Sequence, residues 1–347
     1  MATFEINTDY LQRVLVDLLN TPSPTGDTRY AIGLVQTELE EFGVRSQTTA
    51  KGALVAELDG HFATRPRALS AHVDTLGAMV AEIKPNGRLR LAALNGIVWP
   101  TVESEGVYVA TRSGRRIRGS VVLENGAVHV RDVRSILRDA RNLEVRLDER
   151  TSRAEETRLL GIEVGDFVYF DPRVELSDSG FIRSRFLDDK ACVACLLAAV
   201  KALRDIDVTP GQRTSLLFSN YEEVGHGGFD GLPDDLAEYV VLDMACIGDG
   251  LRGDEFHCSI CMLDSGGPYS RELSDKLRQI ADARGIDLVP DIYPHYGSDG
   301  GAYWRAGGRA QVALVGPGVD TSHGYERTHT DALRETAELI AGYLLSE

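Results

Sequence analysis

The chain has 347 residues, which is long for a single domain, so we expect two domains or one domain with an insertion. Hydrophobic residues make up 43% and charged residues 26%, as in ordinary globular proteins. The 37 basic and 53 acidic residues give a formal net charge of −16, which would repel nucleic-acid phosphates and anionic membrane surfaces. We therefore expect no nucleic acid and no membrane among its partners, and no apolar run approaches the ~20 residues that span a bilayer.

The five cysteines include two C-x-x-C pairs. Cys192 and Cys195 lie in an Ala- and Leu-rich helical run, and Cys258 and Cys261 lie in a strand-like run. Side chains three residues apart on a strand point to opposite faces, which argues against a shared metal. We expect all four to be buried structural thiols. Because such thiols must stay reduced and the N-terminus lacks a secretion signal, we expect a cytoplasmic protein.

The predicted secondary structure of the first half of the chain changes once, from mixed helices and strands to short strands only. Apolar residues at helical spacing predict a helix over residues 10–19 with Asp9 as its N-cap, and a second helix over 27–42 that stops at Gly43. The runs GALVAEL and RALSAHVDT then predict buried strands. Short alternating segments such as VYVATR and LEVRL follow over residues 77–183, which is typical of a β-rich barrel.

Helices and strands alternate again in the second half. The expected elements are helix 190–203, strands TSLLFSN and EYVVLDMA, helix 270–284, strand QVALVG and helix 331–345. The sequence thus predicts an α/β domain formed by residues 1–76 and 184–347. A β-rich insertion at 77–183, barrel-like or PDZ-like, interrupts it.

Five short motifs carry the polar residues of interest, and four of them follow or lie within a predicted strand. They are AHVDTLG (Ala71–Gly77), FLDDK (Phe186–Lys190), NYEEVG (Asn220–Gly225), VVLDMA (Val240–Ala245) and SHGYE (Ser322–Glu326). Open α/β sheets gather ligands at the carboxyl ends of their strands. The motifs supply two histidines and several carboxylates, which suit Zn, Co or Mn.

A pair of metal ions would give these residues distinct tasks. A carboxylate can bridge two ions with its two oxygens, whereas imidazole offers one lone pair, so an aspartate of FLDDK is the natural bridge. A general base must lie close to the attacking water without being a ligand. Consecutive side chains diverge at a strand end, so one of Glu222 and Glu223 can coordinate while the other acts as the base. Asp74, two residues beyond His72 on the same face of a strand, can orient its imidazole.

Each residue taken alone has an ordinary structural explanation. His72 would be a buried, hydrogen-bonded histidine and His323 a loop histidine. The Glu222–Glu223 pair would be solvated, and the Asp188–Asp189 pair would cap a helix. Their joint occurrence at strand ends, in this order, favours a metal centre.

In this order the motifs resemble those of the tetrahedral (TET), deblocking or glutamyl aminopeptidases, metallopeptidase family forty-two. The counterparts of the H-x-D, A-x-D-D/N-R, E-E-x-G, strand-borne Asp and H-S-x-x-E elements of the family cover nearly the whole chain. The resemblance implies a three-layer phosphorylase/hydrolase-like aminopeptidase core, with an inserted β-barrel-like domain that helps to build a homo-oligomer. The resemblance implies that this oligomer is a tetrahedral dodecamer, as is usual in the family. The branch linked to bacterial osmolyte systems (acetylated glutaminylglutamine amide) is most similar, and this resemblance implies a dipeptide-like substrate as an alternative to general peptides.

The resemblance implies roles when it is carried over position by position. It gives five ligands for two divalent metal ions per subunit: His72, Asp188 and Asp243 for one, and Asp188, Glu223 and His323 for the other. Asp188 is preferred to Asp189 as the bridge because the family tolerates Asn at the second position. Glu222 would be the general base, activating water and then protonating the leaving amine. Zn is expected before Co or Mn.

Two residues depart from the family pattern, and one histidine offers an alternative. Lys190 stands where the family usually has Arg, and Gly324 where it usually has Ser. Neither change removes a ligand. His329, close after His323, is the alternative ligand.

The expected function is release of N-terminal residues from short peptides. The segment 297–302 is similar to the GTDA turn of the family, so Ser298 and Asp299 are expected near the substrate. A deacylase or carboxypeptidase would use the same metal centre on an acylated or C-terminal substrate, and the metal ligands do not separate these activities. A non-enzymatic protein that merely keeps the fold is disfavoured because every ligand and the base are present.

Overall fold

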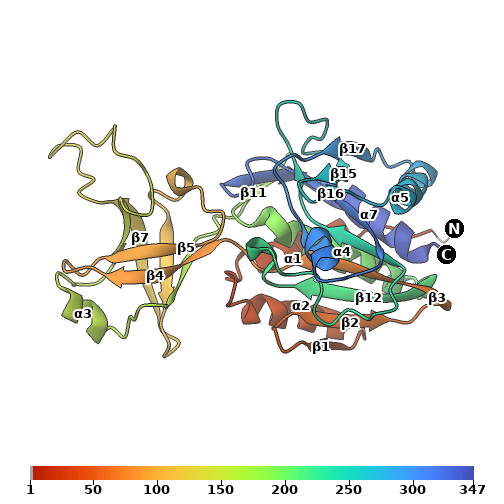
Figure 1. Cartoon of the computed structure of the whole chain (residues 1–347), viewed down its shortest axis with the longest axis horizontal. Helices are drawn as coiled ribbons and strands as arrows, with labels where there is room; N and C mark the ends of the chain where they lie inside the picture. Colours follow the sequence, from red (N-terminus) through yellow and green to blue (C-terminus); the bar gives the residue numbers. More distant parts are fainter. Residues whose placement is uncertain (1–2) are drawn as a thin grey trace. The chain divides into compact units, whose positions relative to one another are not determined.

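The computed structural model describes residues 3–347, which divide into two compact units (Figure 1). The first unit joins the described residues up to Thr75 with Val174–Glu347, and the second is Leu76–Arg173. The alternating hydrophobic pattern of the sequence predicts that residues 174–183 belong to the insertion, but they belong to the first unit. The reason is long-range pairing: β10 (Glu175–Leu176) and β11 (Phe181–Ser184) form a three-stranded sheet with β19 (Glu326–His329).

The first unit is built on a ten-stranded sheet within the described residues, with eight strands in the order β1-β2-β12-β3-β13-β18-β15-β16 and β14 and β17 paired to β18 and β15. The strands are β1 (Ser46–Thr48), β2 (Leu54–Leu58), β3 (Phe62–His72), β12 (Gln212–Ser219), β13 (Glu238–Leu242), β14 (Ala245–Cys246), β15 (Cys258–Asp264), β16 (Gly267–Pro268), β17 (Val289–Ile292) and β18 (Gln311–Val319). Because β12, β3, β13 and β18 are parallel neighbours, their carboxyl ends share one edge.

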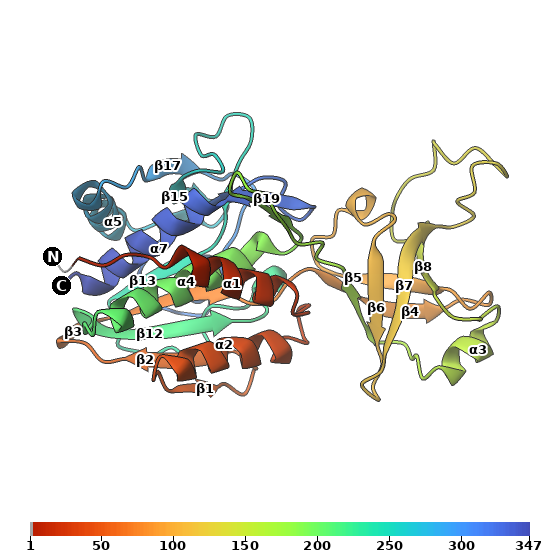
Figure 2. The same ribbon diagram turned by 180° about the vertical axis from the view of Figure 1, so that it is seen from behind.

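Helices cover one face of this sheet (Figure 2). They are α1 (Thr8–Leu19), α2 (Arg29–Glu41), α4 (Leu187–Asp205), α5 (Arg271–Arg284) and α7 (Thr330–Leu345), and their apolar residues share one core with the strands. On the other face, α6 (Asp299–Arg305) packs with loop segments in a second core. Alternation along β3 serves both layers, since Leu69 faces the first core and Ala68 the second. This is the predicted three-layer α/β core.

The first helix shows how local chemistry sets an element boundary. Its N-cap is Asn7, whose side chain accepts a hydrogen bond from the backbone N–H of Tyr10 at 2.9 Å. Asp9 lies inside the first turn, so the expected Asp9 cap is wrong. The negative charge of Asp9 in the first turn still interacts favourably with the positive end of the helix dipole.

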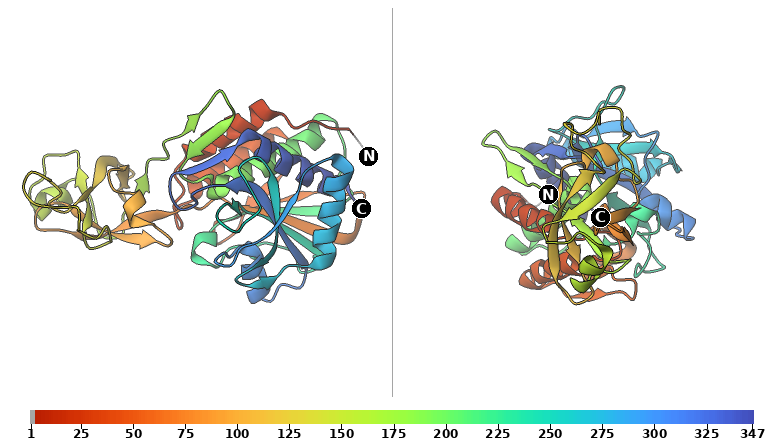
Figure 3. Two further views of the ribbon diagram at one scale, coloured as in Figure 1. Left: turned by 90° about the horizontal axis from the view of Figure 1, so that it is seen from above. Right: turned by 90° about the vertical axis from the view of Figure 1, so that its left-hand side faces the viewer.

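The second unit is a closed antiparallel barrel in the order β4-β5-β8-β7-β6-β9, as its alternating sequence predicts. Figure 3 shows the ribbon of this unit from two further sides. Its elements are β4 (Gly77–Ile83), β5 (Leu89–Leu94), η1 (Trp99–Thr101), β6 (Gly106–Ala110), β7 (Arg116–Leu123), β8 (Leu143–Leu147), α3 (Ala154–Leu159) and β9 (Phe167–Phe170). Every second side chain of β6 points inward, so Val107 and Val109 are fully buried.

All five cysteines are free. The four that form the two C-x-x-C pairs are buried, which confirms them as structural thiols, and Cys246 is half-buried. No helix between residues 3 and 347 has both the length and the apolar character that a membrane span requires.

Candidate metal centre

The carboxyl edge of the parallel strands collects the predicted site residues. His72 ends β3, Asp243 follows β13, Glu222 and Glu223 lie in the 3-10 turn η2 (Glu222–Val224) after β12, and His323 lies in the loop after β18. Asp188 comes from the start of α4, where its ψ of 104° departs from helical geometry. The side chains that follow β3, β12, β13 and β18 therefore meet because these parallel strands end together, and the start of α4 adds Asp188.

Asp188 stands between the two histidines. Its Oδ1 lies 3.2 Å from Nε2 of His72, and its Oδ2 lies 3.6 Å from Nε2 of His323. Glu223 Oε2 lies 3.7 Å from the same nitrogen of His323. Two sets of three ligand-type atoms, each set within 4.8 Å, result: His72, Asp188 and Asp243, and Asp188, Glu223 and His323. The two sets share Asp188.

The imidazole of His72 is prepared to accept a cation. Its Nδ1 lies 2.9 Å from the backbone carbonyl oxygen of Asp74, which can only accept, so Nδ1 carries the proton in the neutral ring. Its Nε2 is buried among carboxylates and has no hydrogen-bond partner within the described residues. A lone pair directed at carboxylates is unfavourable unless a cation lies between them.

The charges of the cluster are poorly compensated. Burial, with Asp188 as the next cause, raises the pKa of Asp243 to about 8. Burial likewise raises the pKa of Glu222 and that of Glu223 well above the usual range, and neighbouring acids add to the effect. For His72, burial lowers the pKa, but Asp188 and the surrounding acids outweigh it and hold the pKa well above its ordinary value. Divalent cations fit this set of donors, since they would compensate the crowded acids.

The carboxylate of Asp74 lies beside His72, as predicted, and also holds the turn of the two glutamates. Its Oδ1 accepts the N–H of Glu222 at 3.1 Å, and its Oδ2 accepts the hydroxyl of Thr25 at 2.7 Å and the N–H of Glu223 at 3.3 Å. The backbone carbonyl oxygen of Asp74 lies 2.9 Å from Nδ1 of His72 and its carboxylate Oδ1 lies 3.6 Å from the same nitrogen, so the orienting role of Asp74 stays a prediction. Through its carboxylate, Asp74 also fixes the turn that carries the two glutamates.

Ser298 and Asp299 are both turned into the protein. Ser298 is 3% exposed, caps α6 and lies 2.7 Å from the hydroxyl of Tyr269. Asp299 is 2% exposed and accepts a hydrogen bond from the hydroxyl of Ser219. A Cβ built on Gly228 would lie 2.6 Å from that of Asp299, so the Asp299 side chain packs against the loop that follows Glu223. Contact with a substrate stays a prediction for both residues.

His329 lies outside both sets of ligand-type atoms. Its Nε2 is 2.8 Å from the carbonyl oxygen of Ser179, and its Nδ1 accepts the N–H of Asp331 at the start of α7. His329, the alternative ligand, therefore acts as the N-cap of α7. The geometry places His323 in the cluster instead.

The two departures from the family pattern leave the cluster complete. Lys190 is fully buried and its Nζ donates to the carbonyl oxygen of Thr21 at 2.6 Å, while burial lowers the pKa of its amine to about 7. Gly324 accepts a hydrogen bond at its carbonyl oxygen from Arg185 Nη1 at 3.0 Å.

Two residues near the cluster escape prediction from the sequence. Tyr296 donates its hydroxyl to the carbonyl oxygen of Met244, next to Asp243, at 2.8 Å, and nothing in the local sequence marks it. Glu326 bonds the backbone of both Asp188 and His323. Its spacing of three residues from His323 within SHGYE was the available signal.

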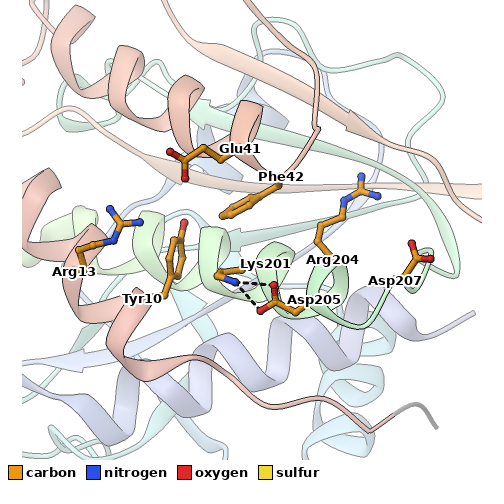
Figure 4. A pocket seen from close by; sticks show the side chains of 8 residues that line it. All are labelled: Tyr10, Arg13, Glu41, Phe42, Lys201, Arg204, Asp205 and Asp207. Carbon is orange, nitrogen blue, oxygen red and sulfur yellow. Dashed lines mark hydrogen bonds and ion pairs between the residues drawn. The ribbon is translucent and has the colours of Figure 1, made fainter.

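One surface cavity, about 640 Å³, lies between α1, α2 and α4 and is lined by Tyr10, Arg13, Glu41, Phe42, Lys201, Arg204, Asp205 and Asp207 (Figure 4). Its three cations and three acids balance, and Lys201 is already paired with Asp205 at 2.7 Å. None of the residues that line this cavity belongs to the metal-type cluster.

Comparisons with known proteins match this fold and cluster. Residues 52–339 match the sequence pattern of the M42 glutamyl aminopeptidases. YhfE of Bacillus subtilis strain 168, which carries a provisional aminopeptidase name, is 44% identical over 334 residues, 96% of each chain.

Solved structures show the same fold. The TET1 peptidase of Pyrococcus horikoshii superposes with a TM-score of 0.84 at 21% identity and covers 97% of this chain and 100% of that one. A TET aminopeptidase of a marine-sediment Thaumarchaeota archaeon gives a TM-score of 0.88 at 17% identity, covering 98% of this chain and 97% of that one. With the family pattern spanning most of the sequence, the chain belongs to the M42 glutamyl aminopeptidase family and is a peptide hydrolase.

Proposed function

We propose that the protein is an aminopeptidase that uses two divalent metal ions to remove N-terminal residues from short peptides. The observation that carries this proposal is the pair of ligand sets that share Asp188, with Glu222 beside them and in neither set. His72, Asp188 and Asp243 would hold one ion, and Asp188, Glu223 and His323 the other. The mixture of imidazole and carboxylate donors suits Zn, with Co or Mn as alternatives.

When bound, such ions acidify a water molecule and polarise the scissile carbonyl. The task of the protein is then to move protons. Glu222 Oε2 lies 3.9 Å from Nε2 of His72, at the edge of the cluster. Burial raises the pKa of Glu222 well above that of an ordinary glutamate, so its carboxylate can take a proton from water. As the C–N bond breaks, the same proton passes from Glu222 to the leaving amine, which restores the carboxylate.

The turn around Glu222 is held so that the base keeps its position. Asp74 accepts the N–H groups of both Glu222 and Glu223, and Thr25 orients the Asp74 carboxylate. Tyr221, just before the base, has a left-handed backbone with φ of 65°. Such a backbone persists only where surrounding contacts fix it. We infer that Asp74 acts on catalysis by positioning the turn of the base.

The base assignment predicts a clear separation of metal binding from turnover. Glu222→Gln should keep about two metal ions per chain by elemental analysis and lose on the order of 10²–10⁴-fold in kcat on aminoacyl-nitroanilides. Glu155→Gln on the exposed face of α3 is the matched control and should behave as wild type. Wild-type turnover in Glu222→Gln would overturn the base assignment.

The aminopeptidase assignment itself is tested with peptides that differ only at the N-terminus. An aminopeptidase requires a free amine near its metals, so N-acetylated peptides should not be hydrolysed. Hydrolysis of the acetylated peptides alone would favour a deacylase, and equal hydrolysis of both kinds would favour a carboxypeptidase. The osmolyte-type dipeptides belong in the same panel, because family resemblance alone points to them.

We also propose that the chain assembles into a homo-oligomer through its barrel unit. The TET1 peptidase of Pyrococcus horikoshii assembles into a tetrahedron or a large octahedral shell. Large apolar side chains are exposed on the barrel unit here, including Val130 at 82%, Leu159 at 85% and Val164 at 67%. An interface that covered these side chains would remove their apolar surface from water. Light scattering should give a dodecamer mass, and a monomer mass at micromolar concentration would exclude the assembly.

A further inference from the structure

Glu326 is a buried carboxylate that joins two distant segments of the cluster. It is 3% exposed and begins β19. Its Oε2 accepts the backbone N–H of Asp188 at 3.1 Å, and its Oε1 accepts the backbone N–H of His323 at 3.0 Å. One carboxylate therefore sets the spacing between two residues that lie far apart in the sequence.

The segments that it joins have unfavourable backbone conformations. His323 has φ of 62° and Phe186, two residues before Asp188, has φ of 73°, both in the left-handed region. Such a backbone is strained and persists only where its surroundings determine it. Without a fixed partner for the N–H of His323, the loop would relax toward right-handed conformations and move the imidazole.

Other contacts tie the same segments together but reach them beside the ligands. The β11–β19 pairing sets Ser184 opposite Glu326, and Arg185 Nη1 donates to the carbonyl oxygen of Gly324. These contacts bring the two segments of the chain together. The bonds of Glu326 act on the ligand residues themselves.

The chemistry of this position requires two acceptors. A carboxylate presents two oxygens to two N–H groups, whereas a glutamine amide presents one oxygen and one NH₂ donor. In Glu326→Gln one of the two backbone N–H groups would face another donor. An unpaired buried N–H is unfavourable, so the segment would shift to satisfy it.

We propose that Glu326 is a positioning residue that sets the distance between the Asp188 carboxylate and the His323 imidazole, and thereby the affinity of their shared site for its cation. This inference rests on the proposed function. In the proposed two-metal site, Glu326 contacts neither the substrate nor a metal ion. Groups that orient metal ligands typically change metal affinity by roughly 10–100-fold when they are removed.

The test measures metal binding directly. Wild type and Glu326→Gln are stripped with a chelator and titrated with Zn²⁺ by calorimetry, and the absorption of bound Co²⁺ reports the geometry of the site. We expect one binding step of Glu326→Gln to weaken by roughly 10–100-fold, with an altered Co²⁺ spectrum. Circular dichroism verifies that the variant is folded.

The matched control is Glu238→Gln at the opposite end of the sheet. Glu238 is 2% exposed and accepts hydrogen bonds from Arg65, Lys276 and Tyr343, so its loss also disturbs a buried carboxylate. Both metal steps should be unchanged in this control. Wild-type metal constants in Glu326→Gln, or equal weakening in both variants, would overturn the proposal.

A second measurement serves if Glu326→Gln does not fold. In the folded wild-type protein the amide protons of Asp188 and His323 should be protected from hydrogen exchange, and exchange at the rate of exposed amides would overturn the inference. If the stripped wild-type protein takes up no metal ion, the proposed function itself fails. If wild type binds two metal ions and Glu326→Gln binds them with the same affinities, only the role of Glu326 is contradicted.

Discussion

The two ends of the parallel strands treat buried charge in opposite ways. At the amino ends, Glu238 accepts hydrogen bonds from Tyr343 Oη at 2.7 Å, Lys276 Nζ at 3.0 Å and Arg65 Nη2 at 3.1 Å. Burial alone would raise the pKa of Glu238, but Tyr343 and Lys276 outweigh it and lower that pKa. At the carboxyl ends, Asp243, Glu222 and Glu223 crowd one another, and burial raises their pKa values.

This difference separates stability from function within one sheet. A carboxylate whose pKa falls on folding stabilises the folded chain at neutral pH, and one whose pKa rises destabilises it. The amino ends thus contribute stability. The carboxyl ends keep an excess of negative charge that cations would relieve, as expected of a site built to bind metals.

The largest effect should come from the shared carboxylate. Asp188→Asn removes a ligand from both sets, so metal content should fall from about two ions to one or none. Turnover should fall on the order of 10³-fold or more, because the metal chemistry is lost. Asp291→Asn is the control, since Asp291 is also buried but accepts hydrogen bonds from Arg252 and Gly253 in a remote loop. Two tightly held ions in Asp188→Asn would contradict its role as the bridge.

Removal of the metals should lower stability at the carboxyl ends. An ion present at a thousand times its Kd stabilises the folded state by about 4 kcal/mol, so chelation should lower the Tm by several degrees. Calorimetric melts with and without chelator measure the change, and added Zn²⁺, Co²⁺ or Mn²⁺ should restore the Tm. Identical melts would show that the crowded acids need no cation.

At the amino ends the same type of substitution should act on stability alone. Glu238→Gln leaves Lys276 and Arg65 without their buried anion, and we expect it to lower the free energy of unfolding by roughly 1–3 kcal/mol. Denaturant titration measures this loss. Glu272→Gln, where the exposed carboxylate accepts only from the Gln311 amide among the described contacts, is the control and should change little. An unchanged unfolding midpoint in Glu238→Gln would remove the contrast between the two ends.

The smallest effect is a pH dependence of the metal-free protein. The pKa of Asp243 rises from its ordinary value of 3.8 to about 8 on folding, so the folded chain binds this proton more tightly than the unfolded chain does. The stability of the chelated protein should therefore increase as the pH falls from 8 toward 5. The increase should be smaller in Asp243→Asn, and melts across this pH range measure it. A metal-free protein that loses stability over that interval would contradict the assignment.

Much of this protein can be read from local pattern. Apolar spacing predicts the helices, alternation predicts the barrel, and ligand-type residues at strand ends predict where His72, Asp188 and His323 meet. These predictions succeed because they depend on periods of two or 3.6 residues and on one rule of parallel sheets.

Only the tertiary structure decides which distant backbones meet. Residues 174–183 belong to the core because β11 pairs with β19, the Asp74 carboxylate holds the glutamate turn, and Glu326 joins Asp188 to His323. Each of these contacts links segments that no local period relates. A sequence pattern records the type of each side chain, but a hydrogen bond to a backbone N–H leaves no mark on the residue that donates it.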